Sequence, residues 1–349
     1  PDFTLPDGKR LPFPGPVTGR DIALAIGPGL AKKAIAIEVD GEVCDLSARL
    51  DRDAKIRILT GRDDDPAALR LLRHSCAHVL AEAVCRLLPG TRLAYGPALD
   101  DGFYYDMATP RPVTSDDFAA IEAEMAKICA ADRPFTRVDC DPAAGLARTQ
   151  GDLYKTDNAQ RALAKGAATL SFYATGTPGA DFEDLCAGPH VPSTGLLKHH
   201  KVMAVAGAYW HGDANSDQLT RLYGICFFDK KALDEHLRRL EEAKKRDHRR
   251  IGREMDLFHL WDENPGQVYW HHKGWTIYRT IEQYVREKIL DHGYIEVKTP
   301  SLQPQVLWER SGHWAKYREN MFLTQEVDRG AKPAEAAALR RLLRWGRLV

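Results

Sequence analysis

Hydrophobic and polar positions alternate in short runs over the first 60 residues, with turn residues between the runs. Two hairpins are predicted, one turning at Pro6-Asp7-Gly8 and the other at Asp40-Gly41. Between them, residues 18–33 have helical spacing that Gly27-Pro28-Gly29 interrupts, and residues 55–59 predict a last strand. Hairpins, a broken helix and a further strand within so short a stretch favour a β-grasp, ubiquitin-like module.

A helix with two apolar stripes is predicted between Asp65 and Pro89. Asp65 can cap it with Pro66 at its first position, and Pro89-Gly90 ends it. One stripe consists of Leu69, Leu72, Cys76, Leu80, Ala83 and Leu87. The opposite stripe consists of Leu71, His74, His78, Ala81 and Cys85. Such a helix is expected to be buried on two sides, with two histidines one turn apart on its second face.

The remaining pattern predicts an α+β domain followed by a second unit. Residues 91–228 alternate short strand and helix patterns with glycine-rich turns, and residues 229–256 predict one long, charged helix. Apolar residues then recur every four positions from Ile277 to Ile289, and Gly293 is expected to end that helix. Residues 294–297 predict a strand that finishes before Pro300.

Composition excludes several classes of protein. A hydrophobic content of 44% with 28% charged residues indicates a globular chain, and no apolar run approaches the roughly 18 residues of a membrane span. The seven cysteines are scattered and never spaced C-x-x-C, which argues against a disulfide framework and a ribbon-type zinc site. The N-terminal residues lack a signal-peptide pattern, so a cytoplasmic location without membrane contact is expected.

Charge does not identify a partner. The charges of the 49 basic and 49 acidic residues cancel, whereas compact nucleic-acid-binding domains usually have a net positive charge. The basic stretch 238–253 is interleaved with acidic residues, which favours a solvated helix face.

Two pairs of side chains are candidates for chemistry. His74 and His78 have the i,i+4 spacing that suits a metal or paired substrate contacts, although such a pair alone is more often structural. Cys186 and His190 are also four apart, beside the Gly188-Pro189 turn. Together the four could form a tetrahedral nitrogen and sulfur site for zinc. The alternative is a buried cysteine and a capping histidine.

Three further stretches are less specific by themselves. Residues 96–106 place Tyr104 and Tyr105 after a turn between two glycines, which suits a pocket wall but equally a core strand. Lys155 follows another glycine-containing turn at 151–154, and residues 207–213 are rich in glycine and aromatics.

In this order and spacing, these stretches resemble threonyl-tRNA synthetase. The resemblance extends to residues 26–31 of the first module, to 246–252 in the linker and to 308–314. Residues 274–277 and 293–300, including Gly293 and Pro300, resemble class II motif 1, which forms the dimer interface in that family. Alanyl-tRNA synthetase and its editing relatives share the histidine and cysteine motifs, but they lack the first module and the run from linker to motif 1.

The resemblance implies an α+β architecture in successive parts. Its parts are a β-grasp TGS domain (1–61), an α+β editing domain (63–228), a linker helix (229–256) and the start of a class II catalytic domain (257–324). Residues 325–349 do not resemble the family, and a frame error in a G+C-rich gene is one explanation. Motifs 2 and 3, and with them the family's ATP–magnesium and catalytic zinc sites, are not found, so aminoacylation by this chain is not expected.

The implied function is proofreading. Serine lacks one methyl group of threonine, a difference worth only about 1–3 kcal/mol in binding, so Ser-tRNA(Thr) forms and must be hydrolysed. The resemblance gives His74, His78, Lys155 and Tyr105 catalytic roles, and it gives Asp184, Cys186 and His190 roles in binding substrate. The partner is the acceptor end of tRNA(Thr). The family's homodimer through motif 1 is implied only where the catalytic sheet is complete. The alternatives are a non-catalytic fragment that binds the acceptor arm and an inert truncated product.

Overall fold

The computed structural model describes residues 1–321. Pro1–Asp247 form one compact unit, and a second unit begins at His248. The atypical tail expected at 325–349 lies outside the described residues, as do the last three residues of the expected 257–324 segment.

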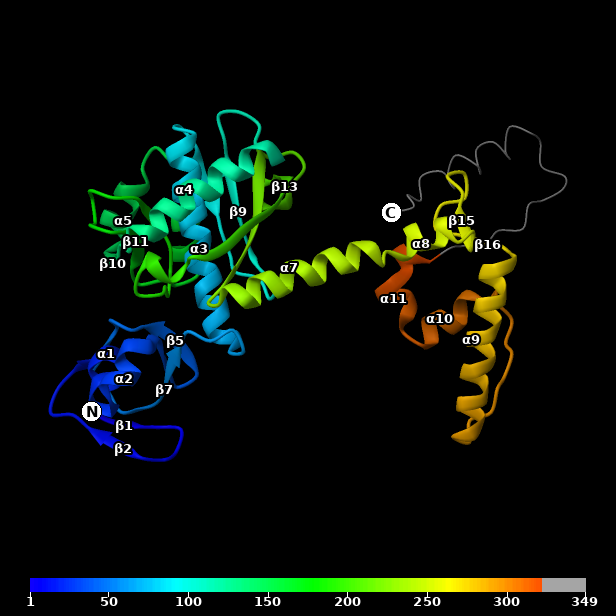
Figure 1. Ribbon diagram of the computed structural model, residues 1–349, viewed down its shortest axis with the longest axis horizontal. Coiled ribbons are helices and arrows are strands. Elements are labelled where there is room, and N and C mark those ends of the chain that lie inside the picture. The colour runs from blue at the N-terminus through cyan, green and yellow to red at the C-terminus, as the bar shows by residue number, and fades with distance from the viewer. Residues whose placement is uncertain (322–349) are drawn as a thin grey trace. The chain divides into compact units, whose positions relative to one another are not determined.

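The chain begins with a five-stranded sheet and two short helices (Figure 1). The strand order is β2 (Arg10–Pro12), β1 (Asp2–Thr4), β7 (Ala54–Thr60), β4 (Ala34–Val39) and β5 (Glu42–Asp45). Only β1 and β7 pair in parallel. The helices are α1 (Gly19–Ile26) and α2 (Pro28–Lys33), and a small ribbon pairs β3 (Val17–Thr18) with β6 (Arg49–Leu50). Both predicted hairpins and the helix break at Gly27 are confirmed.

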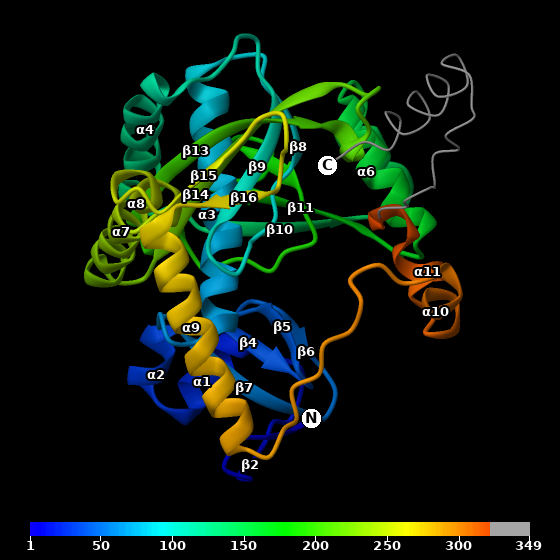
Figure 2. The same cartoon turned by 90° about the vertical axis from the view of Figure 1, so that its right-hand side faces the viewer.

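Helix α3 (Pro66–Leu87) is the central element of the next part of this unit, and the Asp65 side chain caps it as predicted. It packs on a four-stranded antiparallel sheet and on α4 (Phe118–Ala130) (Figure 2). The sheet order is β13 (His199–Tyr209), β14 (Gln218–Phe227), β9 (Phe103–Ala108) and β8 (Arg92–Tyr95). Both stripes of α3 are buried from Ala68 to Val84, apart from His74 and Leu69, which are partly exposed. The prediction of a helix buried on two sides is therefore confirmed.

A second, three-stranded sheet carries part of the candidate site. Its order is β10 (Phe135–Cys140), β11 (Leu170–Thr175) and β12 (Glu183–Leu185). Helices α5 (Pro142–Thr149) and α6 (Leu153–Ala164) pack against β11, and α6 also contacts β8 of the larger sheet. Helix α6 therefore links the two sheets.

The single long helix predicted over 229–256 is wrong. The structure has α7 (Lys230–Lys245), capped by Asp229, and then a separate α8 (His248–Glu254). The backbone leaves helical geometry at Arg246, with φ −95° and ψ 16°. Neither glycine nor proline stands at this break, so the hydrophobic pattern gave no sign of it.

The second unit contains a hairpin and a long helix. Strands β15 (Phe258–Leu260) and β16 (Val268–Trp270) pair, and α9 (His272–Asp291) follows. The predicted helix is confirmed, and Gly293 follows it with φ +80°. Two short helices, α10 (Gln305–Arg310) and α11 (His313–Tyr317), come later.

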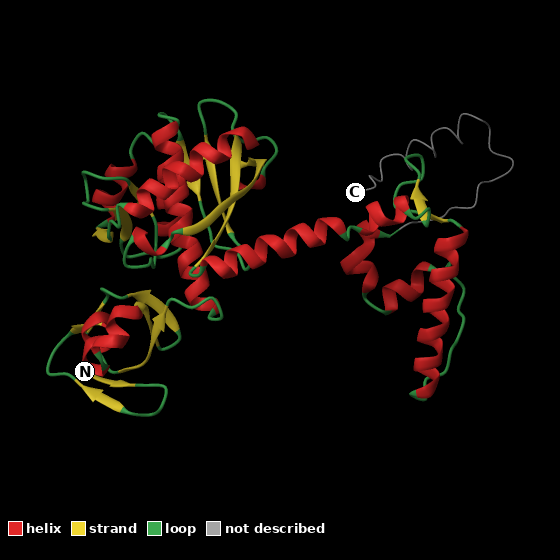
Figure 3. Cartoon of the chain, viewed as in Figure 1, coloured by secondary structure: helices red, strands yellow, loops and turns green. Residues whose placement is uncertain are grey.

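The strand predicted at 294–297 is wrong, because these residues form a loop (Figure 3). A strand needs a neighbour that takes its backbone hydrogen bonds. Within residues 1–321 no strand pairs with this segment, and Ile295 and Val297 are 86% and 78% exposed. In the same range, no helix is both long and apolar enough to cross a membrane.

Candidate functional site

Four separate elements bring the predicted site residues to one cavity of about 700 Å³ in the first unit. Helix α3 provides His74 and His78, β9 provides Tyr105, and α6 provides Lys155. Strand β12 and the loop after it provide Asp184 and Cys186, which also line the cavity. His190 lies behind the wall, fully buried against the other two histidines. All seven predicted residues are thus neighbours.

The thiol of Cys186 lies between two imidazoles. Its Sγ is 3.3 Å from Nε2 of His74 and 3.5 Å from Nε2 of His190. The ligand atoms of these three residues and His78 all lie within 4.8 Å of one another. The tetrad that the sequence predicted therefore forms around a common centre.

Hydrogen-bond partners fix the tautomers of two of the histidines. Nδ1 of His74 is 3.2 Å from the carbonyl oxygen of Pro189, which can only accept, so this nitrogen carries the proton. The Ser75 hydroxyl donates to the Leu71 carbonyl at 2.9 Å, so it accepts from Nδ1 of His190 at 3.1 Å. Both rings therefore turn an unprotonated Nε2 toward the thiol.

The residue types and two of the distances in this donor set suit a zinc ion, whereas the four ligand atoms spread over up to 4.8 Å, wider than tetrahedral coordination. In tetrahedral coordination, sulfur and nitrogen ligands stand about 3.5 Å apart, given Zn–S of about 2.3 Å and Zn–N of about 2.0–2.1 Å. The observed sulfur–nitrogen distances are 3.3 and 3.5 Å. His74, His78, Cys186 and His190 would hold such an ion. Four protein ligands would close its coordination sphere, so it would stabilise the site and leave no open position for substrate.

A buried ion pair forms the second half of the site. Nζ of Lys155 lies 2.5 Å from Oδ1 of Asp184, and it also donates to the Tyr105 hydroxyl at 3.1 Å. The Tyr105 hydroxyl in turn donates to Oδ2 of Asp184. Nδ1 of His78 is 4.0 Å from the same carboxylate. The Tyr105 phenol thus hydrogen-bonds to both members of the ion pair, and the His78 imidazole lies beside the carboxylate.

Burial keeps the tetrad uncharged. It lowers the pKa of His74, lowers that of His78 to about 3, and lowers that of His190 well below its ordinary value. It raises the pKa of the Cys186 thiol to about 12. The imidazoles and the thiol are therefore neutral near pH 7, and each imidazole keeps one unprotonated ring nitrogen.

Asp184 behaves differently because it has a cation beside it. Burial raises its pKa most strongly, but Lys155, His78 and the hydrogen bonds from Lys155 and Tyr105 together bring the pKa below its ordinary value. Burial and the Asp184 charge raise the pKa of Tyr105. The charges of the site are consequently those of Lys155 and Asp184.

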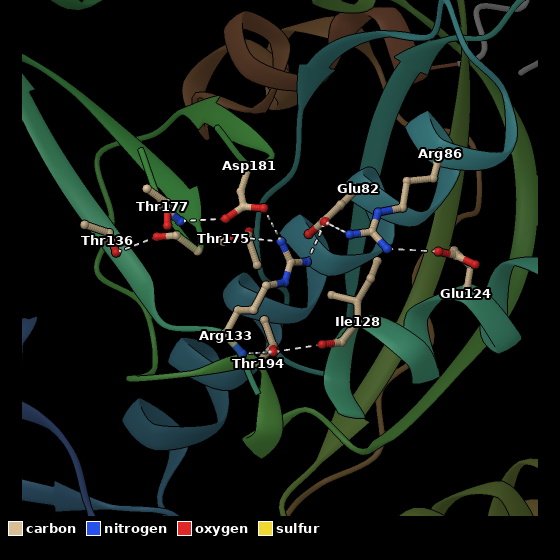
Figure 4. A network of polar contacts seen from close by, with 11 residues as sticks. Glu82, Arg86, Glu124, Ile128, Arg133, Thr136, Thr175, Thr177, Asp181 and Thr194 are labelled. Atoms are coloured by element: carbon tan, nitrogen blue, oxygen red, sulfur yellow. Dashed lines mark hydrogen bonds and ion pairs between the residues drawn. The ribbon is translucent and has the colours of Figure 1, made fainter. Parts of the chain in front are cut away.

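A buried network holds α3 against the sheet that carries Asp184 (Figure 4). Oε1 of Glu82 accepts from Arg133 at 2.5 Å and from Arg86 at 2.6 Å. Arg133 also donates to the Thr175 carbonyl on β11 at 2.5 Å and lies 3.5 Å from Asp181. Glu82 follows His78 by one helical turn, so the network anchors the histidine-bearing helix to the neighbouring sheet.

Sequence reasoning missed several residues that support the site, among them Ser75, Glu82, Arg133 and Asp45. None has a motif spacing that could have revealed it. Conversely, the 207–213 stretch belongs to the end of β13 and the following turn, and it does not line the cavity. Its His211 pairs with Asp157 on α6 at 2.7 Å. Gly293 and Pro300 belong to the second unit.

Comparison with known proteins gives two domain matches and a set of relatives. Residues 2–60 match the TGS domain, and residues 170–223 match the threonyl and alanyl tRNA synthetase second additional domain. The threonine–tRNA ligase of Acidiphilium cryptum (strain JF-5) is 50% identical over 331 residues, which are 94% of this chain and 50% of that protein. Those of Verminephrobacter eiseniae (strain EF01-2) and Hahella chejuensis (strain KCTC 2396) are 49% and 48% identical, over 94% of this chain and 50% and 51% of the relative.

The chain thus spans about half the length of the curated relatives it matches. The order of the two matched domains agrees with the β-grasp sheet and with the α+β part that carries the cavity. The chain has the TGS and second additional domains of the threonine–tRNA ligase family, and it belongs to that family over the 94% of its length that aligns.

Proposed function

We propose that this chain hydrolyses the ester of serine wrongly attached to tRNA(Thr). The observation that carries the proposal is the convergence of Lys155, Asp184 and the neutral His74–His78 pair on one cavity of about 700 Å³. A cavity of this size can accept a terminal nucleoside with a small acyl group. The names of the relatives support tRNA(Thr) as partner, and the match to the second additional domain supports hydrolysis.

In the proposed domain organisation, residues 1–61 are the TGS domain and 63–228 the editing domain. Residues 229–256 are the linker, and 257–324 begin the class II domain with Gly293 and Pro300 in its motif 1. The whole protein's partners would then be tRNA(Thr) and a second copy of the chain. The activity proposed for this chain is confined to hydrolysis, and ligation of threonine to tRNA by the purified chain would contradict that restriction.

The proposed chemistry needs an oriented water and a means of carrying charge on the ester oxygen. A neutral imidazole, His74 or His78, accepts a proton as water attacks the ester carbonyl, and it returns that proton to the departing ribose oxygen. The Lys155 ammonium stabilises the negative oxygen of the intermediate. Asp184 attracts the amino group of the substrate, Tyr105 holds the carboxylate in place, Cys186 forms the wall behind the ester, and His190 supports that wall from behind.

Selectivity in this proposal is steric. We infer that the part of the cavity that receives the amino-acid side chain accepts serine and excludes the extra methyl of threonine. A zinc ion in the tetrad would fix the four side chains, but it would also occupy the lone pairs of the His74 and His78 imidazoles. The steps above therefore belong to the metal-free tetrad.

The test is release of amino acid from Ser-tRNA(Thr) and Thr-tRNA(Thr) by the purified chain. We expect serine release only, and we expect its loss in His74→Ala. A His199→Ala variant removes a histidine of β13 that does not line the cavity, and it should retain the rate. No release of serine by the unaltered chain would refute the proposal, and tRNA binding without release would favour a binding fragment.

A further inference from the structure

The β-grasp sheet reaches the candidate site through strand β5. Asp45 is the last residue of β5, and its Oδ1 accepts a hydrogen bond from the backbone N–H of His190 at 2.9 Å. Its Oδ2 accepts the hydroxyl of Tyr173 at 2.5 Å. On the same strand, Val43 lines the cavity itself. Both carboxylate oxygens of Asp45 are thus engaged with a part of the chain more than a hundred residues away.

The loop that receives these bonds is closely packed. The Tyr173 ring centroid lies 4.4 Å from that of His190, and the Phe135 ring stacks on this imidazole at 4.9 Å. Gly188 adopts φ +72°, and a Cβ there would clash with the hydroxyl oxygen of Tyr173. The Tyr173 hydroxyl therefore rests directly on the turn between Cys186 and His190, and Asp45 fixes that hydroxyl.

From His190 the contacts lead to the tetrad. Its backbone is held by Asp45, its Nδ1 by Ser75 at 3.1 Å, and its Nε2 faces the Cys186 thiol at 3.5 Å. His74 meets the same thiol at 3.3 Å and the Pro189 carbonyl at 3.2 Å. A shift of the 186–190 loop would therefore move both polar contacts that orient the His74 ring.

We propose that Asp45 is a positioning residue of the hydrolytic site, so that the β-grasp domain completes the site of its neighbour. This inference rests on the proposed function. Without the carboxylate, the buried N–H of His190 and the hydroxyl of Tyr173 lose their acceptor, and the loop is free to relax away from α3. Small displacements of catalytic groups lower turnover far more than they lower binding.

The experiment compares three variants in serine release from Ser-tRNA(Thr), each with the full chain. Asp45→Ala removes both acceptors, and we expect kcat to fall roughly tenfold or more with KM little changed. Asp45→Asn keeps one acceptor for the His190 N–H and should recover much of the loss. Glu42→Ala removes an exposed carboxylate from the same strand, and it should behave as the unaltered chain. Equal kcat in Asp45→Ala and Glu42→Ala would overturn the inference.

To distinguish positioning from a purely structural role, kcat is measured on the folded protein well below its melting temperature. There, reduced stability alone leaves kcat unchanged. If Asp45→Ala does not fold, Tyr173→Phe removes only the hydroxyl and serves in its place, with a smaller fall in kcat expected. A normal kcat in Tyr173→Phe would then overturn the inference.

Failure of the proposed function gives a different result. If the unaltered chain releases no serine, the imidazole NMR signals of His74 and His190 still test Asp45. We expect them to shift in Asp45→Ala and to stay in place in Glu42→Ala. Unchanged signals in both variants would overturn the positioning role whatever the activity.

Discussion

The Cys186 thiol has one proton and two unprotonated nitrogens within 3.5 Å. It can donate to only one of them at a time, so one of His74 and His190 keeps a free lone pair. Because His190 is sealed behind the wall, His74 is the nitrogen that a water in the cavity can reach. This favours His74 over His190 as the group that takes a proton.

The first prediction concerns the cation of the site. Lys155→Met keeps most of the side-chain volume but removes the ammonium that lies 2.5 Å from Asp184. We expect serine release to fall by about 100-fold or more, because a preorganised charge beside a developing oxyanion is lost. Lys165→Met, at the exposed end of α6, should retain the rate. Retained activity in Lys155→Met would show that this ammonium takes no part.

The second prediction is a pH dependence of stability. Burial lowers the pKa of His78 from 6.5 to about 3, so the unfolded state binds a proton in this window that the folded state does not. The free energy of unfolding should therefore fall as pH drops below about 6.5, by about 1.4 kcal/mol per pH unit for this residue. Urea denaturation in the presence of a chelator measures it. His78→Gln should show a shallower slope, and an identical slope would contradict the assignment.

At the scale of elements, the two arginines on Glu82 allow a matched comparison. Both donate to the same oxygen, but Arg133 is 18% exposed and also binds β11, whereas Arg86 is 44% exposed (Figure 4). Removing a partner from a buried charge costs about 3–5 kcal/mol, and an exposed pair is worth about 1 kcal/mol or less. Arg133→Met should therefore lower the free energy of unfolding much more than Arg86→Met. If urea denaturation shows the same loss of unfolding free energy in both variants, Arg133 is not a buried anchor.

The elements that sequence could predict are those with a local pattern. The two stripes of α3, the β-grasp hairpins and the spacing within each half of the tetrad all follow from residues close together in the chain. Lys155 and Asp184 have no such pattern, and only the resemblance to a family pointed to them. Asp45 and Arg133 had no indication at all, because their partners lie far away along the chain.

The two elements that were predicted wrongly failed for different reasons. The charged pattern over 229–256 is continuous, yet the backbone turns at Arg246 without glycine or proline. Residues 294–297 have β-forming side chains, but a strand also requires a pairing partner, and among the described residues none is placed beside them. Propensity indicates what a segment can form, whereas its neighbours decide what it does form.

At the scale of the whole chain, the long helix of the second unit predicts self-association. On α9, Ile281 is 58% exposed and Val285 49%, with further exposed aromatics on the same helix. Exposed apolar surface of this kind promotes association. Sedimentation velocity should show species that grow with concentration, and Ile281→Glu with Val285→Glu should shift them to the monomer. Gln283→Glu changes a neighbouring polar position and should leave the association unchanged. A monomer at all concentrations of the unaltered chain would contradict the expectation.

The two hydrogen bonds that Asp45 accepts also affect how genes of related proteins can be recombined. The stretch between the β-grasp sheet and α3 is a natural breakpoint for exchanging first domains between relatives, because few residues lie between them. A chimaera joined there inherits its His190 anchor from the donor of the first domain. Only donors with an acidic or amide residue at the end of β5 should yield a working site, so the two domains are expected to be inherited as a matched pair.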